Sequence, residues 1–198
     1  MACADGLPWN RHACRRCAIP LPESGGVCGQ CLTTPPPLDA VHAAFVYAFP
    51  IDRLVPRLKF HRDLAAGRLL ADLMGQSLCG DAAWPEAIVP IPLHRARLRE
   101  RGYDQALELA VPLSRRTGIA LRADALMRQR ATSAQSELDA DARRRNLRDA
   151  FSVAQALPAH VVLVDDVMTT GATLHAAARA LRKAGVRRID AWVCARVP

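Results

Sequence analysis

Aromatic residues are scarce in this sequence: phenylalanine, tryptophan and tyrosine together make up 5% of its 198 residues. Long apolar runs are also missing, the longest being AAFVYAF at 43–49, whereas a membrane-spanning helix needs about 20 apolar residues. The opening MACADGLPWN has neither the basic region nor the apolar region of a secretory signal. We therefore expect a cytoplasmic protein without membrane insertion. The shortage of aromatics also disfavours a dedicated single-strand binder, which stacks bases on such rings.

The sequence contains two lysines, Lys59 and Lys183, so the net charge of +8 is carried almost entirely by arginine. The basic residues concentrate between positions 94 and 148. A basic surface of this kind favours phosphate-bearing partners, either nucleic acid or a small phosphorylated metabolite. Taken singly, each arginine is explained equally well as a solvated charge on a helix face.

Cysteine, in contrast, is abundant: seven are present, and four of them form two CxxC pairs, CRRC and CGQC, separated by ten residues. Those four are Cys14, Cys17, Cys28 and Cys31. Four thiolates on two tight turns suit a tetrahedral zinc ion, and the alternative is two unrelated thiol pairs or a disulfide. Three prolines in TTPPPL, at 33–38, form a stiff spacer. The spacing thus predicts a small zinc ribbon with its spacer at 1–40 and a second domain at 41–198.

Beyond residue 40, apolar strand-like runs alternate with helix-like stretches. We expect strands at 41–49, 87–93, 160–166 and 188–197, and helices at 51–60, 64–78, 103–118, around 138–147 and at 172–183. Pro56 is expected to limit the first helix, Pro92 to stop the second strand and Gly118 to close the third helix. Strands that alternate with helices predict an α/β fold with a parallel sheet and helices on both faces.

The junction after the third expected strand, VVLVDDVMTTGATL at 161–174, carries two adjacent acids, Asp165 and Asp166. Hydroxyls and a flexible turn follow at Thr169, Thr170, Gly171 and Thr173. In an open parallel sheet, ligands bind beyond the carboxyl ends of the strands, and the start of a helix there offers unpaired amides to a phosphate. Acids repel phosphate, so the pair must serve sugar hydroxyls or a metal ion. The stretch predicts a phosphorylated-sugar site, and the alternative is a threonine-capped turn with an incidental acid pair.

The segment VLVDDVMTTGAT resembles the phosphoribosyl pyrophosphate (PRPP) signature of type I phosphoribosyltransferases. The resemblance extends over nearly the whole chain to the ComF (competence protein F, ComFC-like) family, through the cysteine ribbon and three further blocks. These are RLKFHRD at 57–63, IVPIPLHRARLRERGYDQA at 88–106 and LMRQRATSAQSELDADARRRNLRDAF at 126–151. The resemblance implies a type I phosphoribosyltransferase-like parallel sheet flanked by helices, with a small N-terminal zinc ribbon.

By this resemblance, Asp165 and Asp166 would be the catalytic acids that bind the ribose 2- and 3-hydroxyls. The 5-phosphate would be held by Thr169, Thr170, Gly171, Ala172 and Thr173. The turn at Pro92, Leu93 and His94 would correspond to the pyrophosphate loop, with Arg95 or Arg97 as counter-charge and Lys59 as a further contact to PRPP. A hood or loop over the site would include Arg128, Arg130, Thr132 and Gln135. Taken alone, Lys59 is equally well a solvated residue at a helix end.

The reaction that the resemblance implies is displacement of pyrophosphate from the anomeric carbon of PRPP by a nitrogen nucleophile, with Mg²⁺ accompanying PRPP. Thr169 stands where 6-oxopurine enzymes carry an acid, which disfavours purine salvage, and no residue identifies the acceptor. Asp104, in RGYDQ, departs from the frequent RGFNQ and changes the charge near a helix start. We expect a ComF-type phosphoribosyltransferase that acts in competence, DNA uptake or nucleotide metabolism.

The alternative is a non-catalytic nucleic-acid-binding protein, in which the zinc ribbon and the arginine-rich helices contact DNA and the PRPP pocket is a sensor or a relic. The family's link to competence favours it, and single-stranded DNA or DNA-processing proteins would be its partners. Zinc ribbons bind nucleic acid or protein, or only stabilise a terminus. Type I phosphoribosyltransferases are often dimeric, so the resemblance also leaves a homodimer open.

Overall fold

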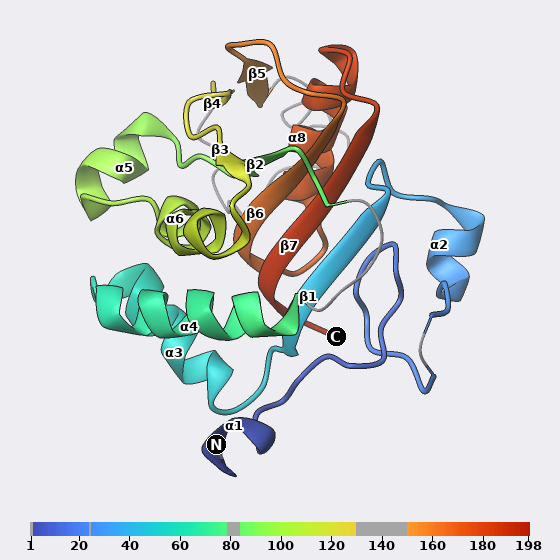
Figure 1. Cartoon of the computed structure of the whole chain (residues 1–198), viewed down its shortest axis with the longest axis vertical. Helices are drawn as coiled ribbons and strands as arrows, with labels where there is room; N and C mark the ends of the chain where they lie inside the picture. The colour runs from blue at the N-terminus through green and yellow to red at the C-terminus, as the bar shows by residue number, and fades with distance from the viewer. Residues whose placement is uncertain (1, 24, 79–83, 130–149) are drawn as a thin grey trace, which may run out of the picture.

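A five-stranded parallel sheet forms the centre of the computed structural model, which describes the chain except for residues 1, 24, 79–83 and 130–149 (Figure 1). Three of the expected hood residues, Arg130, Thr132 and Gln135, and the helix expected around 138–147 lie outside the described residues. Within the described part, no helix is both long enough and apolar enough to cross a membrane.

The strands of this sheet are ordered β1-β7-β6-β2-β3, and a separate antiparallel pair joins β4 to β5. Their bounds are β1 Ala40–Val46, β2 Ala87–Pro90, β3 Ala120–Leu121, β4 Leu126–Arg128, β5 Phe151–Val153, β6 His160–Met168 and β7 Arg188–Arg196. The helices are α1 Ala2–Asp5, α2 Gly29–Thr33, α3 Ile51–Phe60, α4 Leu64–Ser77, α5 Arg95–Arg101, α6 Gln105–Thr117 and α8 Ala172–Lys183. All neighbouring strands of the large sheet run parallel, as the alternation of strands and helices predicts.

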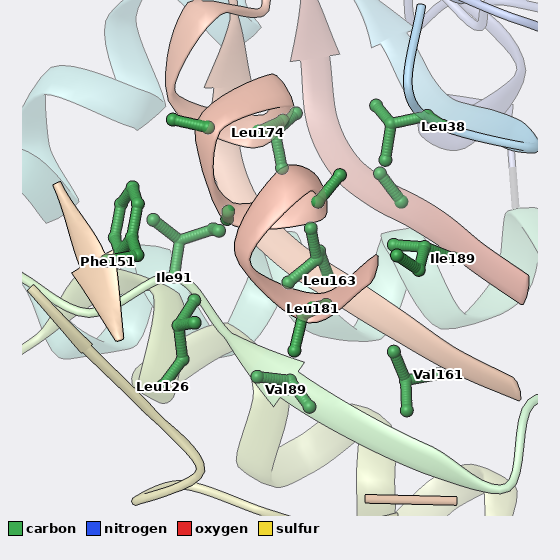
Figure 2. Close-up of a cluster of buried hydrophobic side chains, with 14 of the residues drawn as sticks. Leu38, Val89, Ile91, Leu126, Phe151, Val161, Leu163, Leu174, Leu181 and Ile189 are labelled. Carbon is green, nitrogen blue, oxygen red and sulfur yellow. The ribbon is translucent and has the colours of Figure 1, made fainter. Parts of the chain in front are cut away.

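Both faces of the sheet are covered because its central strand, β6, is apolar on both sides. Successive residues of a strand point to opposite faces. Val161 and Leu163 pack in the cluster that contains α8, and Figure 2 shows Leu181 of α8 beside Leu163. Their neighbours in β6 pack in a second cluster with α3, α4 and α6. Ala18 and Leu38, which precede the sheet in sequence, are fully buried in the α8 cluster.

Helix α3 has the bounds expected from the sequence, Ile51–Phe60. Pro56 lies inside it without limiting it, because one missing N–H removes one helical hydrogen bond while the helix still buries Val55 and Leu58. The strand expected to stop at Pro92 ends at Pro90. Gly118, in contrast, closes α6 in the left-handed conformation, as expected.

Strand β6 extends two residues beyond the acid pair because β7 pairs with it as far as Met168. On its other side, β2 ends at Pro90, opposite Val164. From Asp165 onward, no strand in the described part of the chain pairs with β6 on that side. The early end of β2 therefore opens the space in which the acid pair lies.

Candidate functional site

A cavity of about 690 Å³ lies beyond the end of β2, against the last residues of β6. Its lining includes Tyr47, Lys59, Phe60, Arg97, Arg101, Gln105, Arg128, Asp165, Asp166, Thr169, Thr170, Ala172 and Thr173. The cavity therefore brings together side chains from α3, α5, β4, β6 and the start of α8. This is the place where parallel α/β sheets bind ligands.

The two adjacent acids differ in exposure: Asp165 is partly exposed, whereas Asp166 is buried. Asp166 is 3% exposed, and its Oδ2 lies 3.1 Å from Nζ of Lys59. Its Oδ1 accepts a hydrogen bond from the Val167 amide at 2.8 Å, and Oδ1 of Asp165 accepts one from the Asp166 amide at 2.9 Å. Burial, together with the charge of Asp166, raises the pKa of Asp165 well above its usual range. The pair is thus electrostatically unfavourable by itself and is suited to a cation or to hydroxyl donors.

Replacing Asp165 by asparagine should make the ligand-free chain more stable at neutral and alkaline pH. Because folding raises the pKa of Asp165, the folded chain retains this proton at pH values where the unfolded chain has released it. The stability of the unaltered chain should therefore fall as pH rises from about 4, the usual aspartate pKa, through the raised pKa of the folded state. Urea unfolding between pH 5 and pH 8 measures this. The advantage of Asp165→Asn should grow with pH, and an advantage that shrinks would contradict the raised pKa.

The turn from Thr169 to Thr173 leads directly into α8. Gly171 is the residue before the helix and has a φ of +77°, which disfavours any residue with a Cβ. A Cβ there would also lie 2.5 Å from Cε of Met168. Thr169 and Thr170 are exposed, and the Thr170 hydroxyl accepts a hydrogen bond from the Ala172 amide at 3.4 Å. The glycine thus gives a close approach to the first amides of α8, where an anion is favoured.

Arginines from two elements line the same cavity as the acid pair. Arg97 and Arg101 are four residues apart on α5 and therefore share one face of this helix. Arg128 reaches the cavity from β4, and its burial lowers its pKa. Of the predicted counter-charges, Arg97 lines the cavity and Arg95 lies outside its described lining. His94 also lies outside it: its Nδ1 accepts from the Ala96 amide at 3.3 Å and so caps α5.

Asp104 connects the turn after β2 to the start of α6. Its Oδ1 caps α6 by accepting from the amides of Ala106 and Leu107 at 2.9 and 3.2 Å. Its Oδ2 accepts from the Leu93 amide at 2.8 Å. An asparagine offers one acceptor oxygen and could not make both kinds of contact. The aspartate in RGYDQ therefore fixes the turn at 92–94 relative to α6.

Several residues of the cavity wall were not predicted from the sequence, among them Tyr47, Phe60, Arg101 and Gln105. A usable signal existed for two of them. Arg101 follows Arg97 at helical spacing, and Phe60 follows Lys59 directly. Tyr47 and Gln105 carry no such signal, because their positions depend on how β1 and α6 pack.

The four cysteines of the two CxxC pairs form a compact cluster. All their Sγ atoms lie within 4.8 Å of one another, and Sγ of Cys17 lies 3.7 Å from that of Cys28. Thiolates at about 2.3 Å from a tetrahedral zinc ion would lie about 3.8 Å apart, so the cluster fits such an ion. Although burial opposes it, hydrogen bonds from the amides of Cys28, Arg16 and Cys17 lower the pKa of Cys14 to about 7. A lowered pKa favours the thiolate of Cys14, whereas burial raises the pKa values of Cys17 and Cys31.

One arginine joins the cysteine cluster to the end of β6. Nε of Arg196 donates to the backbone oxygen of Cys17 at 2.9 Å, and its Nη1 donates to that of Met168 at 3.2 Å. Met168 immediately precedes the turn at 169–173. The position of the cysteine cluster is thus linked to the position of this turn.

A family model described as phosphoribosyl transferase domain matches residues 107–198. Together with the parallel sheet and the acid pair before a threonine-glycine turn, this match defines a phosphoribosyltransferase-like protein. Among solved structures, the glutamine phosphoribosylpyrophosphate amidotransferase of B. subtilis is similar, with a TM-score of 0.45 and 20% identity. That similarity covers 66% of this chain and 26% of the amidotransferase.

Several relatives match nearly the whole chain. DNA utilization protein YhgH of Escherichia coli (strain K12) is 33% identical over 200 residues, which cover 98% of this chain and 88% of the relative. Competence protein F of Haemophilus influenzae is 36% identical over 192 residues, covering 92% and 84%. The chain therefore belongs to the competence protein F (ComF) family.

Proposed function

We propose that this chain binds PRPP with Mg²⁺ in the cavity at the end of β6 and transfers the phosphoribosyl group to a nitrogen acceptor, in the use of DNA or the competence for which its relatives are named. One observation carries the proposal: a single cavity joins an acid pair, an open helix start and four cationic side chains, Lys59, Arg97, Arg101 and Arg128. Acids suit hydroxyls and a divalent cation, the helix start suits a phosphate, and the cations suit a diphosphate.

In this proposal, each group has a role that follows from its place. Asp165 and Asp166 would hold the ribose and favour the positive charge that develops on its ring as pyrophosphate leaves. The amides and hydroxyls of the turn at 169–173 would fix the 5-phosphate. Arg97 would stabilise the departing diphosphate, and Mg²⁺, when bound with PRPP, would supply further neutralisation of that charge. Lys59 would balance the charge of Asp166 before the ligand arrives.

The test of turnover is pyrophosphate release from PRPP across a panel of purine, pyrimidine and pyridine bases. Pyrophosphate release that occurs only when a particular base is present, and that disappears in the Asp165→Asn variant, supports the assignment of this chain as an enzyme. PRPP that binds but releases no pyrophosphate with any acceptor favours a sensor. Thr169 provides no carboxylate for a purine nitrogen, so 6-oxopurines should be poor acceptors.

The second candidate function is nucleic-acid binding, and the observation that favours it is the exposure of α5. Every residue of this arginine-rich helix is at least partly exposed, and Arg95 and Arg99 lie outside the cavity lining. Arginines placed in this way can contact backbone phosphates. If the surface binds single-stranded DNA, Arg95→Gln with Arg99→Gln should weaken binding and reduce its dependence on salt, while PRPP binding is unchanged. Equal DNA binding by the double variant would exclude Arg95 and Arg99 as DNA contacts.

The cluster of Cys14, Cys17, Cys28 and Cys31 would hold a structural zinc ion in this proposal. Its Sγ spacing supports a tetrahedral site. Ala18, next to Cys17, is fully buried in the core, so the cluster would fix the N-terminal segment against the sheet. This placement favours a structural role over a purely DNA-binding one.

A further inference from the structure

One wall of the cavity carries an exposed aromatic ring that the proposed roles leave unused. Phe60 is 66% exposed, although a ring of this size is usually buried, and it lines the cavity. It directly follows Lys59, whose Nζ contacts Asp166. The ring is therefore one residue away from the ion pair that marks the proposed ribose end of the site.

The ring is held in place from one side. The guanidinium of Arg101 lies over it, 5.6 Å from the ring centroid, and Nη1 of Arg101 donates to Oε1 of Gln105 at 2.6 Å. Gln105 is 5% exposed, so this anchor belongs to the packed start of α6. In addition, the Tyr103 hydroxyl donates to the backbone oxygen of Leu58, which ties the end of α3 to the same region. The aromatic surface is thus preorganised, while most of it faces the cavity or solvent.

We infer that Phe60 and Arg101 form a subsite for a planar aromatic base, either the acceptor or the base of the nucleotide product; this inference rests on the proposed function. A fixed ring with one open face offers a stacking surface to any heterocycle. The guanidinium beside it adds hydrogen-bond donors and a cation for electron-rich or anionic rings. Aliphatic amines and short peptides have no flat ring to stack on Phe60, so this surface would add nothing to their binding affinity.

The side chains that line the cavity also indicate how a base would be recognised. Its acidic side chains are Asp165 and Asp166, both assigned to the sugar, so within the described lining no carboxylate remains to accept from the base. Recognition by stacking tolerates several bases, because each one presents a flat face. The subsite should therefore discriminate weakly among heterocycles and strongly against non-aromatic acceptors.

The experiment compares ribose 5-phosphate with the nucleoside 5-monophosphates AMP, GMP, CMP and UMP by titration calorimetry in the presence of Mg²⁺. The ratio of the two dissociation constants isolates the contribution of the base, because both ligands share the sugar and the phosphate. At least one nucleotide should bind about tenfold more tightly than ribose 5-phosphate. Phe60→Leu should bring this ratio close to one.

Phe49→Leu is the matched control. Phe49 is 76% exposed and lies outside the described lining of the cavity, so this variant should keep the tenfold ratio. A ratio near one in the unaltered chain, or a ratio that survives in Phe60→Leu, would overturn the subsite while PRPP binding still supports the proposed function. If PRPP with Mg²⁺ does not bind at all, both the proposed function and the subsite fall.

Discussion

Replacing Asp165 and Asp166 together by asparagine should abolish the thermal stabilisation of this chain by PRPP with Mg²⁺. Hydrogen bonds to charged groups contribute about 1.5 to 3 kcal/mol each, so losing both acids should weaken PRPP binding by about 100-fold or more. Asparagine keeps the shape of each side chain but removes the charge that a cation requires. At a PRPP concentration of 100 times its dissociation constant, the unaltered chain should gain about 2.7 kcal/mol, and the double variant almost none.

The variant should remain folded, because burial and the charge of Asp166 both raise the pKa of Asp165, and asparagines place no negative charge at these positions. Asp72→Asn is the matched control: Asp72 is an exposed acid on α4 and does not line the cavity. It should keep the full PRPP shift. A double variant that still shows this shift would exclude the acid pair as the ribose-binding group.

The parts of the site that the sequence predicts are those whose residues are neighbours in the chain. Asp165, Asp166 and the turn at 169–173 come from one strand and the start of one helix, so spacing alone places them together. The same holds within each CxxC pair. The contact of Lys59 with Asp166 could not be predicted in this way, because it depends on how α3 packs against the sheet.

Helix α5 could not be predicted from the sequence pattern. His94 precedes this helix and Arg95 begins it, whereas Arg97 and Arg101 on one face of the helix line the cavity. Strand β2 ends earlier than expected because its pairing with β6 stops at Pro90, while β6 continues to Met168 beside β7. The alternation of strands and helices, in contrast, is a property of the chain itself, and the parallel fold follows from it.

The second large effect concerns the cysteine cluster. Cys14→Ser with Cys31→Ser should remove bound zinc and leave a chain that does not fold stably at 37 °C. Cys14 and Cys31 are 0% and 7% exposed, and the cluster is joined to Met168 through Arg196. Structural zinc contributes about 10 to 16 kcal/mol in zinc-finger peptides, more than the total stability of most domains. Metal analysis of the unaltered chain, purified under reducing conditions, should find about one zinc per chain.

Cys194→Ala separates loss of metal from loss of a buried thiol. Cys194 is fully buried in β7, outside the cluster, so this variant should keep its zinc.

Where the double serine variant cannot be purified, chelation of the folded, unaltered chain tests the same role of zinc. Zinc release should lower the midpoint of thermal unfolding by more than 10 °C, since about 1 kcal/mol corresponds to a few degrees for a chain of this size. Because Arg196 ties the backbone of Cys17 to Met168, the residue before the turn at 169–173, chelation should also weaken the PRPP shift. A chain that contains no zinc, or that keeps its midpoint after chelation, would leave the four thiols without a structural role.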